Sequence, residues 1–187
     1  MRVLGNAFRA YALSAAFAIT MAIPAFAQSG HSDLLSTVRI ENFGAISPTY
    51  YRGSQPRGDD YANLATAGVK LVIDLQEYGD NTEQAMVEQA GMRFVRIPMN
   101  TRINPTTSQI EQFLALVNDP ANQPVYVHCA GGRHRTGVMT ALYRMTNDGW
   151  KADQAFTEMK KFDFGPTFLH PEFKRFVYDY KAVTATN

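Results

Sequence analysis

A cysteine and an arginine flank a glycine-bearing stretch in the C-terminal half of the chain. Cys129 follows a short apolar, β-branched run, and five residues separate it from Arg135. This order predicts a strand that delivers a thiol to a turn, and a helix that begins at the turn. The first N–H groups of such a helix lack intrahelical partners and, with the helix dipole and Arg135, can hold a dianionic phosphate. The same positive surroundings favour the thiolate over the thiol.

The stretch therefore combines a nucleophile with a phosphoryl clamp. Cys129 is expected to attack phosphorus, and Arg135 to grip two phosphoryl oxygens through the transition state. Thr136 is expected to donate to the sulfur and help it leave. His128 either braces the loop through hydrogen bonds or is a buried structural histidine. The remaining donors are expected to be the backbone N–H groups of Ala130, Gly131, Gly132, Arg133, His134 and Arg135.

A lone cysteine is often a small buried core residue, because free cysteine is among the most buried residue types. An apolar site, however, would not be ringed by His128, Arg133, His134 and Arg135. Cys129 is the only cysteine of the chain, so no intramolecular disulfide can form. A reactive role explains this solitary thiol better than a structural one.

The N-terminal 27 residues have the pattern of a signal peptide. A basic start precedes an apolar run over residues 11–23, and Ala25 and Ala27 offer a small-x-small cleavage site. The run is short for a membrane span, although a retained amphipathic anchor is the alternative. We therefore expect an exported protein, periplasmic or secreted after cleavage near Ala27, with no stable membrane span in the mature chain.

The rest of the chain is expected to be a linker over residues 28–36 and one domain over residues 37–187. The formal net charge of the whole chain is +1, which gives no support for a nucleic-acid partner. The predicted strands cover residues 38–43, 50–52, 69–75, 92–97 and the run before Cys129, and predicted helices lie near 60–67, 82–90, 108–117, 137–148, 153–162 and 171–180. This alternation predicts a compact α/β fold with a mostly parallel sheet flanked by helices and a ligand at the carboxyl ends of the strands.

The order His-Cys, five residues, Arg and then Ser or Thr resembles the motif of the cysteine-dependent protein tyrosine and dual-specificity phosphatases. The segments 51–56, 68–75 and 94–99 are similar, in their order, to bacterial dual-specificity-like phosphatases, and the basic loop is similar to the atypical plant and fungal group. The resemblance implies a phosphatase fold of the dual-specificity type and a phosphocysteine intermediate on Cys129. It also implies that neither a metal nor another cofactor is needed.

The expected partner is a phosphorylated substrate, which is a protein, an inositol phosphate or another small phosphate ester. Arg133 and His134 make the loop more basic than one phosphate requires. They are either an idle solvated pair or, as the resemblance to the basic-loop group implies, contacts for a multiply charged substrate. Arg102 is a further candidate substrate clamp, and the oligomeric state stays open.

Most members of the resembled family carry an aspartate as general acid after the strand that ends here at Pro98. The segment 99–105 contains no carboxylate. Glu77, Asp163 and His134 are the candidate substitutes, and the acid stays unassigned. Loss of an acid hurts poor leaving groups most, so we expect a preference for phosphotyrosine and other aryl phosphates, or for phosphoanhydrides. The alternative functions are a phosphate-binding pseudophosphatase and a rhodanese-like sulfurtransferase.

Overall fold

The computed structural model describes residue 35 and residues 37–181. The predicted signal peptide and nearly all of the predicted linker lie outside the described residues, so export and the cleavage site stay predictions. Within the described residues, no helix has both the length and the apolar character that a membrane crossing requires.

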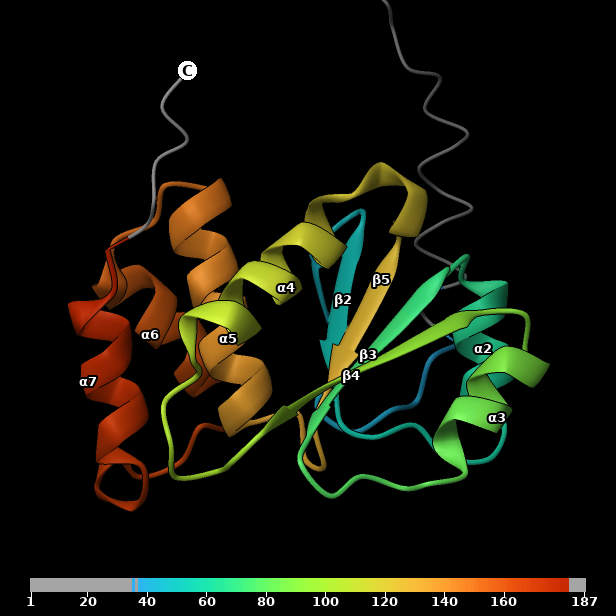
Figure 1. Cartoon of the computed structure of the whole chain (residues 1–187), viewed down its shortest axis with the longest axis horizontal. Coiled ribbons are helices and arrows are strands. Elements are labelled where there is room, and N and C mark those ends of the chain that lie inside the picture. Colours follow the sequence, from blue (N-terminus) through green and yellow to red (C-terminus); the bar gives the residue numbers. More distant parts are fainter. Residues whose placement is uncertain (1–34, 36, 182–187) are drawn as a thin grey trace, which may run out of the picture.

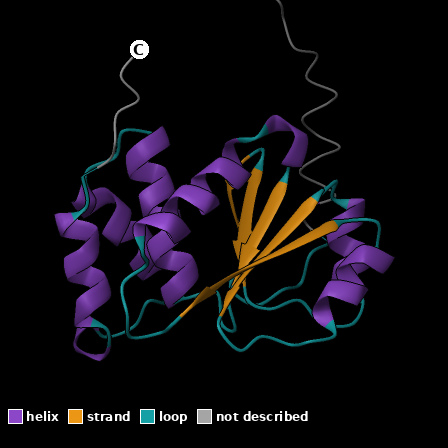
Figure 2. Cartoon of the chain, in the orientation of Figure 1, coloured by secondary structure: helices purple, strands orange, loops and turns teal. Residues whose placement is uncertain are grey.

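A five-stranded sheet forms the centre of the fold, in the order β1-β2-β5-β3-β4 (Figures 1 and 2). The first pair is antiparallel and all other neighbours run parallel, which confirms the mostly parallel sheet. The strands are β1 (Gly44–Ser47), β2 (Tyr50–Gly53), β3 (Leu71–Gln76), β4 (Arg93–Met99) and β5 (Val125–His128). Because β5 is the middle strand, the chain leaves the sheet at Cys129 with a strand on either side.

Helices cover both faces of the sheet (Figure 1). One face carries α2 (Asp60–Thr66) and α3 (Glu83–Gln89). The other carries α4 (Thr107–Asn118), α5 (His134–Asn147), α6 (Ala152–Lys161) and α7 (Pro171–Asp179). Two short 3-10 helices, η1 (Pro120–Asn122) and η2 (Thr167–Leu169), complete the described elements.

Two hydrophobic cores result, because successive strand residues point to opposite faces of a sheet. Val125 and Val127 belong to the core under α4–α7, whereas Tyr126 belongs to the core under α2 and α3. Cys129 lies in the α4–α7 core. The alternation therefore directs His128 to the opposite face, toward α3.

The strand predicted over residues 38–43 is wrong. This segment is irregular, with a turn in which the N–H of Phe43 donates to the carbonyl of Ile40 at 3.2 Å. Asn42 has a left-handed backbone with φ of 57°, a region that asparagine tolerates better than most residues. The first strand starts only at Gly44, because this turn interrupts the alternating pattern.

Three predicted boundaries also shift. Strand β4 continues through Pro98 to Met99, which is possible because an edge strand does not need every N–H. Helix α4 begins at Thr107, one residue earlier than expected, and its capping box is formed by Thr106 and Gln109. Helix α5 begins at His134, three residues earlier than expected.

The loop between β5 and α5 packs directly on the end of β2, and Gly132 makes this approach possible. Its φ is +63°, and an added Cβ would collide with the carbonyl of Gly53 and lie 2.7 Å from the nitrogen of Ser54. A Cβ on Gly131 would meet the side chain of Arg133 only at 3.5 Å, an ordinary contact.

We therefore expect Gly132→Ala to lower the free energy of unfolding by about 2–5 kcal/mol, because a left-handed alanine and backbone overpacking each cost energy. The matched Gly131→Ala variant should cost far less. Urea denaturation of both variants measures the difference, and equal losses would contradict the packing argument.

Candidate active site

Cys129 and Arg135 lie where strand β5 passes into helix α5. The Cys129 side chain is 3% exposed, and Arg135 is 9% exposed in the first turn of the helix. Nη1 of Arg135 donates to the carbonyl of Met99, at the end of β4, at 3.3 Å. The guanidinium therefore reaches across the carboxyl ends of the parallel strands, beside the thiol loop.

The backbone carbonyls of the loop are bound from outside it. The carbonyl of Ala130 accepts from the N–H of Gln55 at 3.3 Å. Nδ2 of Asn42 donates to the carbonyls of Gly131, at 3.3 Å, and Gly132, at 3.0 Å. In a trans peptide the C=O and the following N–H point in opposite directions. Since these three carbonyls face outward, the three N–H groups that follow them turn to the inside of the loop.

The inward N–H groups belong to Gly131, Gly132 and Arg133, and the start of α5 adds more. The N–H of Gly137 bonds to the carbonyl of Arg133, as the first helical turn requires, so the preceding helical N–H groups lack intrahelical acceptors. This ring of donors and the positive end of the helix dipole form an anion-binding site next to Cys129.

Arg52 supports the loop from within the core. It is fully buried, its guanidinium lies 4.1 Å from the ring centroid of Phe162, and its Nη2 donates to the carbonyl of Gly132. Burial lowers the pKa of Arg52, while the neighbouring Tyr50 phenol and then the Cys129 thiol oppose this shift. A buried guanidinium thus adds positive charge on the α5 side of the nucleophile.

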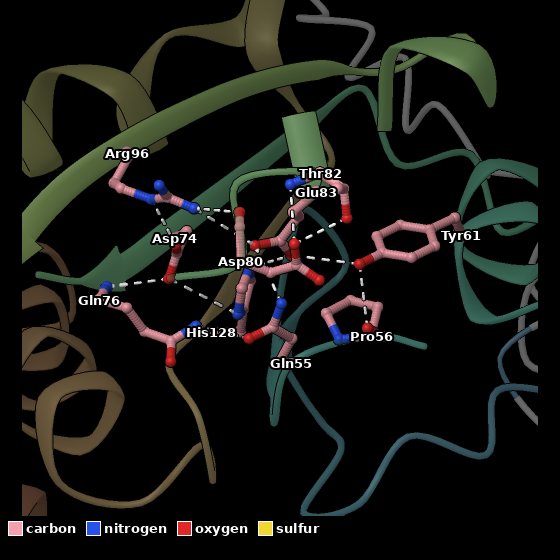
Figure 3. A network of polar contacts seen from close by, with 10 residues as sticks. All are labelled: Gln55, Pro56, Tyr61, Asp74, Gln76, Asp80, Thr82, Glu83, Arg96 and His128. Atoms are coloured by element: carbon pink, nitrogen blue, oxygen red, sulfur yellow. Dashed lines mark hydrogen bonds and ion pairs between the residues drawn. The ribbon is translucent and has the colours of Figure 1, made fainter. Parts of the chain in front are cut away.

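Thr136 and His128 are both fully buried. Within the described part of the chain, the Thr136 hydroxyl has no hydrogen-bond partner, which leaves it free for the role expected at the sulfur. Nε2 of His128 lies 3.0 Å from Oε1 of Glu83, and Nδ1 lies 3.9 Å from Oδ1 of Asp74 (Figure 3). His128 therefore faces acidic groups on the far side of the sheet rather than the inside of the loop.

A metal ion is sometimes held by clustered carboxylate and imidazole groups, and such a cluster is formed by Asp74, Glu83 and His128. Nε of Arg96, however, lies 2.7 Å from Oδ2 of Asp74, and its Nη2 lies 4.0 Å from Oε2 of Glu83. The guanidinium already supplies positive charge to both carboxylates. This arrangement fits an internal ion-pair network better than an open metal site.

The two extra basic residues of the loop are already engaged. Arg133 pairs with Glu41 through Nη2 and with Asp163 through Nε, both at 3.0 Å. Nε2 of His134 lies 2.9 Å from the carbonyl of Phe164, so this nitrogen carries the hydrogen. Burial, followed by the nearby His170, lowers the pKa of His134 and favours its neutral ring.

The three candidate acids do not point to one proton donor. Asp163 is bound to Arg133, and His134 is directed at the carbonyl of Phe164. Glu77 is exposed, and it accepts a hydrogen bond from Nδ2 of Asn100, on the segment that carries the acid in the resembled family, at 2.9 Å.

The candidate clamp Arg102 is exposed on the same segment. Its backbone N–H donates to Oδ1 of Asn100 at 2.9 Å, which shapes the loop. Nothing in these contacts directs its side chain to Cys129, so its role at the substrate stays a prediction.

Sequence reasoning missed the residues that hold the loop open, namely Asn42, Arg52 and Gln55. An asparagine next to a glycine-containing turn is the weak signal for Asn42, since it tolerates a left-handed backbone. Arg52 and Gln55 lie in the segment 51–56, which resembles bacterial dual-specificity-like phosphatases, but residue type alone does not indicate what the Arg52 side chain or the Gln55 backbone binds.

Sequence comparisons with known proteins show the family of this chain. The family described as "DSP-PTPase phosphatase fused to NAD+ Kinase" matches residues 20–173. The dual specificity protein phosphatase TpbA of Pseudomonas aeruginosa (strain UCBPP-PA14) is 31% identical over 124 residues, 66% of this chain and 56% of TpbA. The inositol diphosphatase SIW14 of Saccharomyces cerevisiae is 28% identical over 131 residues, 66% of this chain and 46% of SIW14. The chain thus spans about half the length of these two relatives.

Solved structures agree with the sequence matches. The core catalytic domain of the PP-IP phosphatase SIW14 from S. cerevisiae, in complex with citrate, has a TM-score of 0.67 and 25% identity, covering 76% of this chain and 87% of that one. A Cys-to-Ser variant of P. aeruginosa TpbA in complex with pTyr has a TM-score of 0.65 and 26% identity, covering 75% and 85%. The phosphatase fold of the dual-specificity type is therefore confirmed, and the chain belongs to the DSP-PTPase family whose description names a phosphatase fused to NAD+ kinase.

Proposed function

We propose that the protein is a cysteine-dependent phosphatase that hydrolyses phosphomonoesters through a phosphocysteine intermediate on Cys129. The observation that carries the proposal is the arrangement around the thiol loop. Its carbonyls are bound from outside by Asn42, Arg52 and Gln55, so its N–H groups converge beside Cys129 and Arg135.

The chemistry follows from this arrangement. The Cys129 thiolate attacks phosphorus, an S–P bond forms, and the bond from phosphorus to the leaving oxygen breaks. The loop N–H groups and the fork of Arg135 hold the three remaining phosphoryl oxygens. Water then attacks phosphorus, the S–P bond breaks, inorganic phosphate leaves, and the Thr136 hydroxyl stabilises the departing thiolate.

We further propose that the substrate is an aryl phosphate with one phosphate group, such as phosphotyrosine. A multiply charged substrate would need free cations, but Arg133 already binds two carboxylates and the pKa of His134 is lowered. The absence of a carboxylate at 99–105 in the sequence supports the same choice. A phenol, with a pKa of about 10, leaves without help more readily than an aliphatic alcohol.

The first test is metal-free hydrolysis of p-nitrophenyl phosphate by the reduced protein, beside Cys129→Ser and Arg135→Ala. We expect Cys129→Ser to abolish turnover. Arg135→Ala should reduce kcat/KM by about 100-fold or more, because it removes a charged contact to the transferring group. A folded, reduced wild-type protein that binds phosphate without turnover would favour the pseudophosphatase. Thiosulfate:cyanide activity without phosphatase activity would favour the sulfurtransferase.

The second test compares phosphotyrosine and phosphoserine in peptides of the same sequence. We expect kcat/KM to be at least about 100-fold higher for phosphotyrosine, which is the scale of a missing general acid. Glu77→Gln is the matched variant and should leave this ratio unchanged. Comparable values for the two peptides, or a selective loss on phosphoserine in Glu77→Gln, would contradict the proposed leaving-group preference.

The lowered pKa of His134 predicts a pH dependence of stability. The unfolded residue titrates near 6.5, and the folded residue titrates lower because of burial and then His170. Stability from the neutral ring is therefore present above pH 6.5 and is lost as the pH falls toward the folded pKa. We expect His134→Gln to lose less Tm than wild type between about pH 7 and pH 5. Parallel curves of Tm against pH would contradict this assignment.

A further inference from the structure

We propose that Glu83 is a positioning residue that holds His128 as a doubly protonated imidazolium behind Cys129. Glu83 touches neither the substrate nor the sulfur in this proposal, and it acts only through His128. The inference deepens the proposed function and rests on it, since it concerns the nucleophile of that reaction.

The contact is direct and lies in the interior. Oε1 of Glu83 lies 3.0 Å from Nε2 of His128, and Oδ1 of Asp74 lies 3.9 Å from Nδ1 on the other side of the ring. All three side chains are fully buried. Figure 3 shows the imidazole between a carboxylate from strand β3 and a carboxylate from the start of helix α3.

Both ring nitrogens therefore face groups that, when ionised, can only accept hydrogen bonds. A neutral imidazole has one nitrogen without hydrogen, whose lone pair would be directed at a buried carboxylate oxygen. An imidazolium presents positive charge to both acids, and the two contacts are ion-pair contacts, since neither ring nitrogen forms a hydrogen bond within the described residues. These distances are the geometric basis for proposing the charged form of His128.

The charges around His128 support the same state. Arg96 faces both carboxylates, at 2.7 Å from Asp74 and 4.0 Å from Glu83, and its Nη2 also donates to the carbonyl of Asp80 at 2.8 Å. With an imidazolium, Arg96 and His128 balance the two buried acids. With a neutral ring, one negative charge would stay uncompensated in the interior, which is costly.

The other neighbours complete the surroundings of this network. The Tyr126 ring stacks on His128 with centroids 5.7 Å apart. The hydroxyl of Tyr61 donates to the carbonyl of Pro56 at 3.0 Å and lies 3.5 Å from Oε1 of Glu83, while Nε2 of Gln55 donates to Oε2 of Glu83 at 3.4 Å. Polar groups thus surround the Glu83 carboxylate, and Gln55 also binds the thiol loop through its backbone.

The imidazolium is adjacent in the chain to Cys129 but lies on the opposite face of the sheet. Arg52 and Arg135 provide positive charge on the face of the thiol. His128 adds a positive charge from behind, where substrate and solvent do not enter, so it favours the thiolate before substrate binds. Loss of Glu83 should therefore reduce the thiolate fraction without removing a substrate contact.

The test is the rate of Cys129 alkylation by iodoacetamide as a function of pH, because Cys129 is the only thiol of the chain. We expect Glu83→Gln to move the midpoint of this profile upward by about one pH unit. The matched control is Glu88→Gln on the same helix, since Glu88 is exposed and accepts a hydrogen bond from Nε2 of Gln84 at 2.9 Å. Equal midpoints in Glu83→Gln and Glu88→Gln would overturn the proposal.

A double-mutant comparison separates action through His128 from a general loss of charge. His128→Gln should raise the alkylation midpoint, and Glu83→Gln should raise it no further in that background. Additive shifts would show that Glu83 acts on Cys129 independently, and would overturn the proposed route.

A measurement on the wild-type protein does not depend on whether a buried variant folds. Nitrogen-15 NMR, with the His128 signals identified by their loss in His128→Gln, should show both ring nitrogens protonated at pH 7. A neutral ring at that pH would overturn the proposal. Neither alkylation nor NMR requires turnover, so a wild-type protein without phosphatase activity would contradict the proposed function and leave this inference to be decided by its own result.

Discussion

The candidate site depends on the hydrogen bonds that bind the carbonyls of the thiol loop from outside. Peptide groups are planar, so an outward carbonyl forces the next N–H inward. Asn42, Arg52 and Gln55 supply the donors, and they come from the N-terminal part of the chain, far in sequence from residues 130–132. Without them the same glycine-containing loop could turn its carbonyls toward the phosphate, and an anion would then be repelled.

Strand β5 divides the chemistry between the two faces of the sheet. Side chains alternate along a strand, so His128 and Cys129 enter different layers although they are neighbours in the chain. The α5 face holds the nucleophile and the buried Arg52, whereas the α3 face holds Asp74 and Glu83. The acids beside the histidine therefore do not face the anion site, and each layer can balance its own charge.

The loop offers a substrate less positive charge than its basic residues suggest, because two of them are bound to other groups. Arg133 is matched by Glu41 and Asp163, which are distant from it in sequence. His134 connects the loop to the segment after α6 through the carbonyl of Phe164. These two residues attach the loop to its surroundings, and Arg135 is left as the loop side chain that we propose for phosphate binding.

The amino-acid sequence by itself determined the fold class and the mostly parallel sheet, and it led to the prediction that Cys129, Arg135 and the loop between them form the site. These features depend on local order, since strand pattern, turn glycines and helix start lie within one short segment. The confirmed family and fold agree with what this short segment predicted.

Tertiary structure decided what each polar side chain contacts. The irregular segment at Asn42 was mistaken for a strand because alternation does not show that a left-handed residue interrupts it. The buried Glu83 looks like an ordinary first-turn acid in the sequence, and Arg133 looks like a free cation. The role of Glu83 arises only when strands β3, β4 and β5 align, because its partners Arg96 and His128 lie on different strands. The role of Arg133 arises only when the segments that carry Glu41 and Asp163 meet the loop in the folded chain.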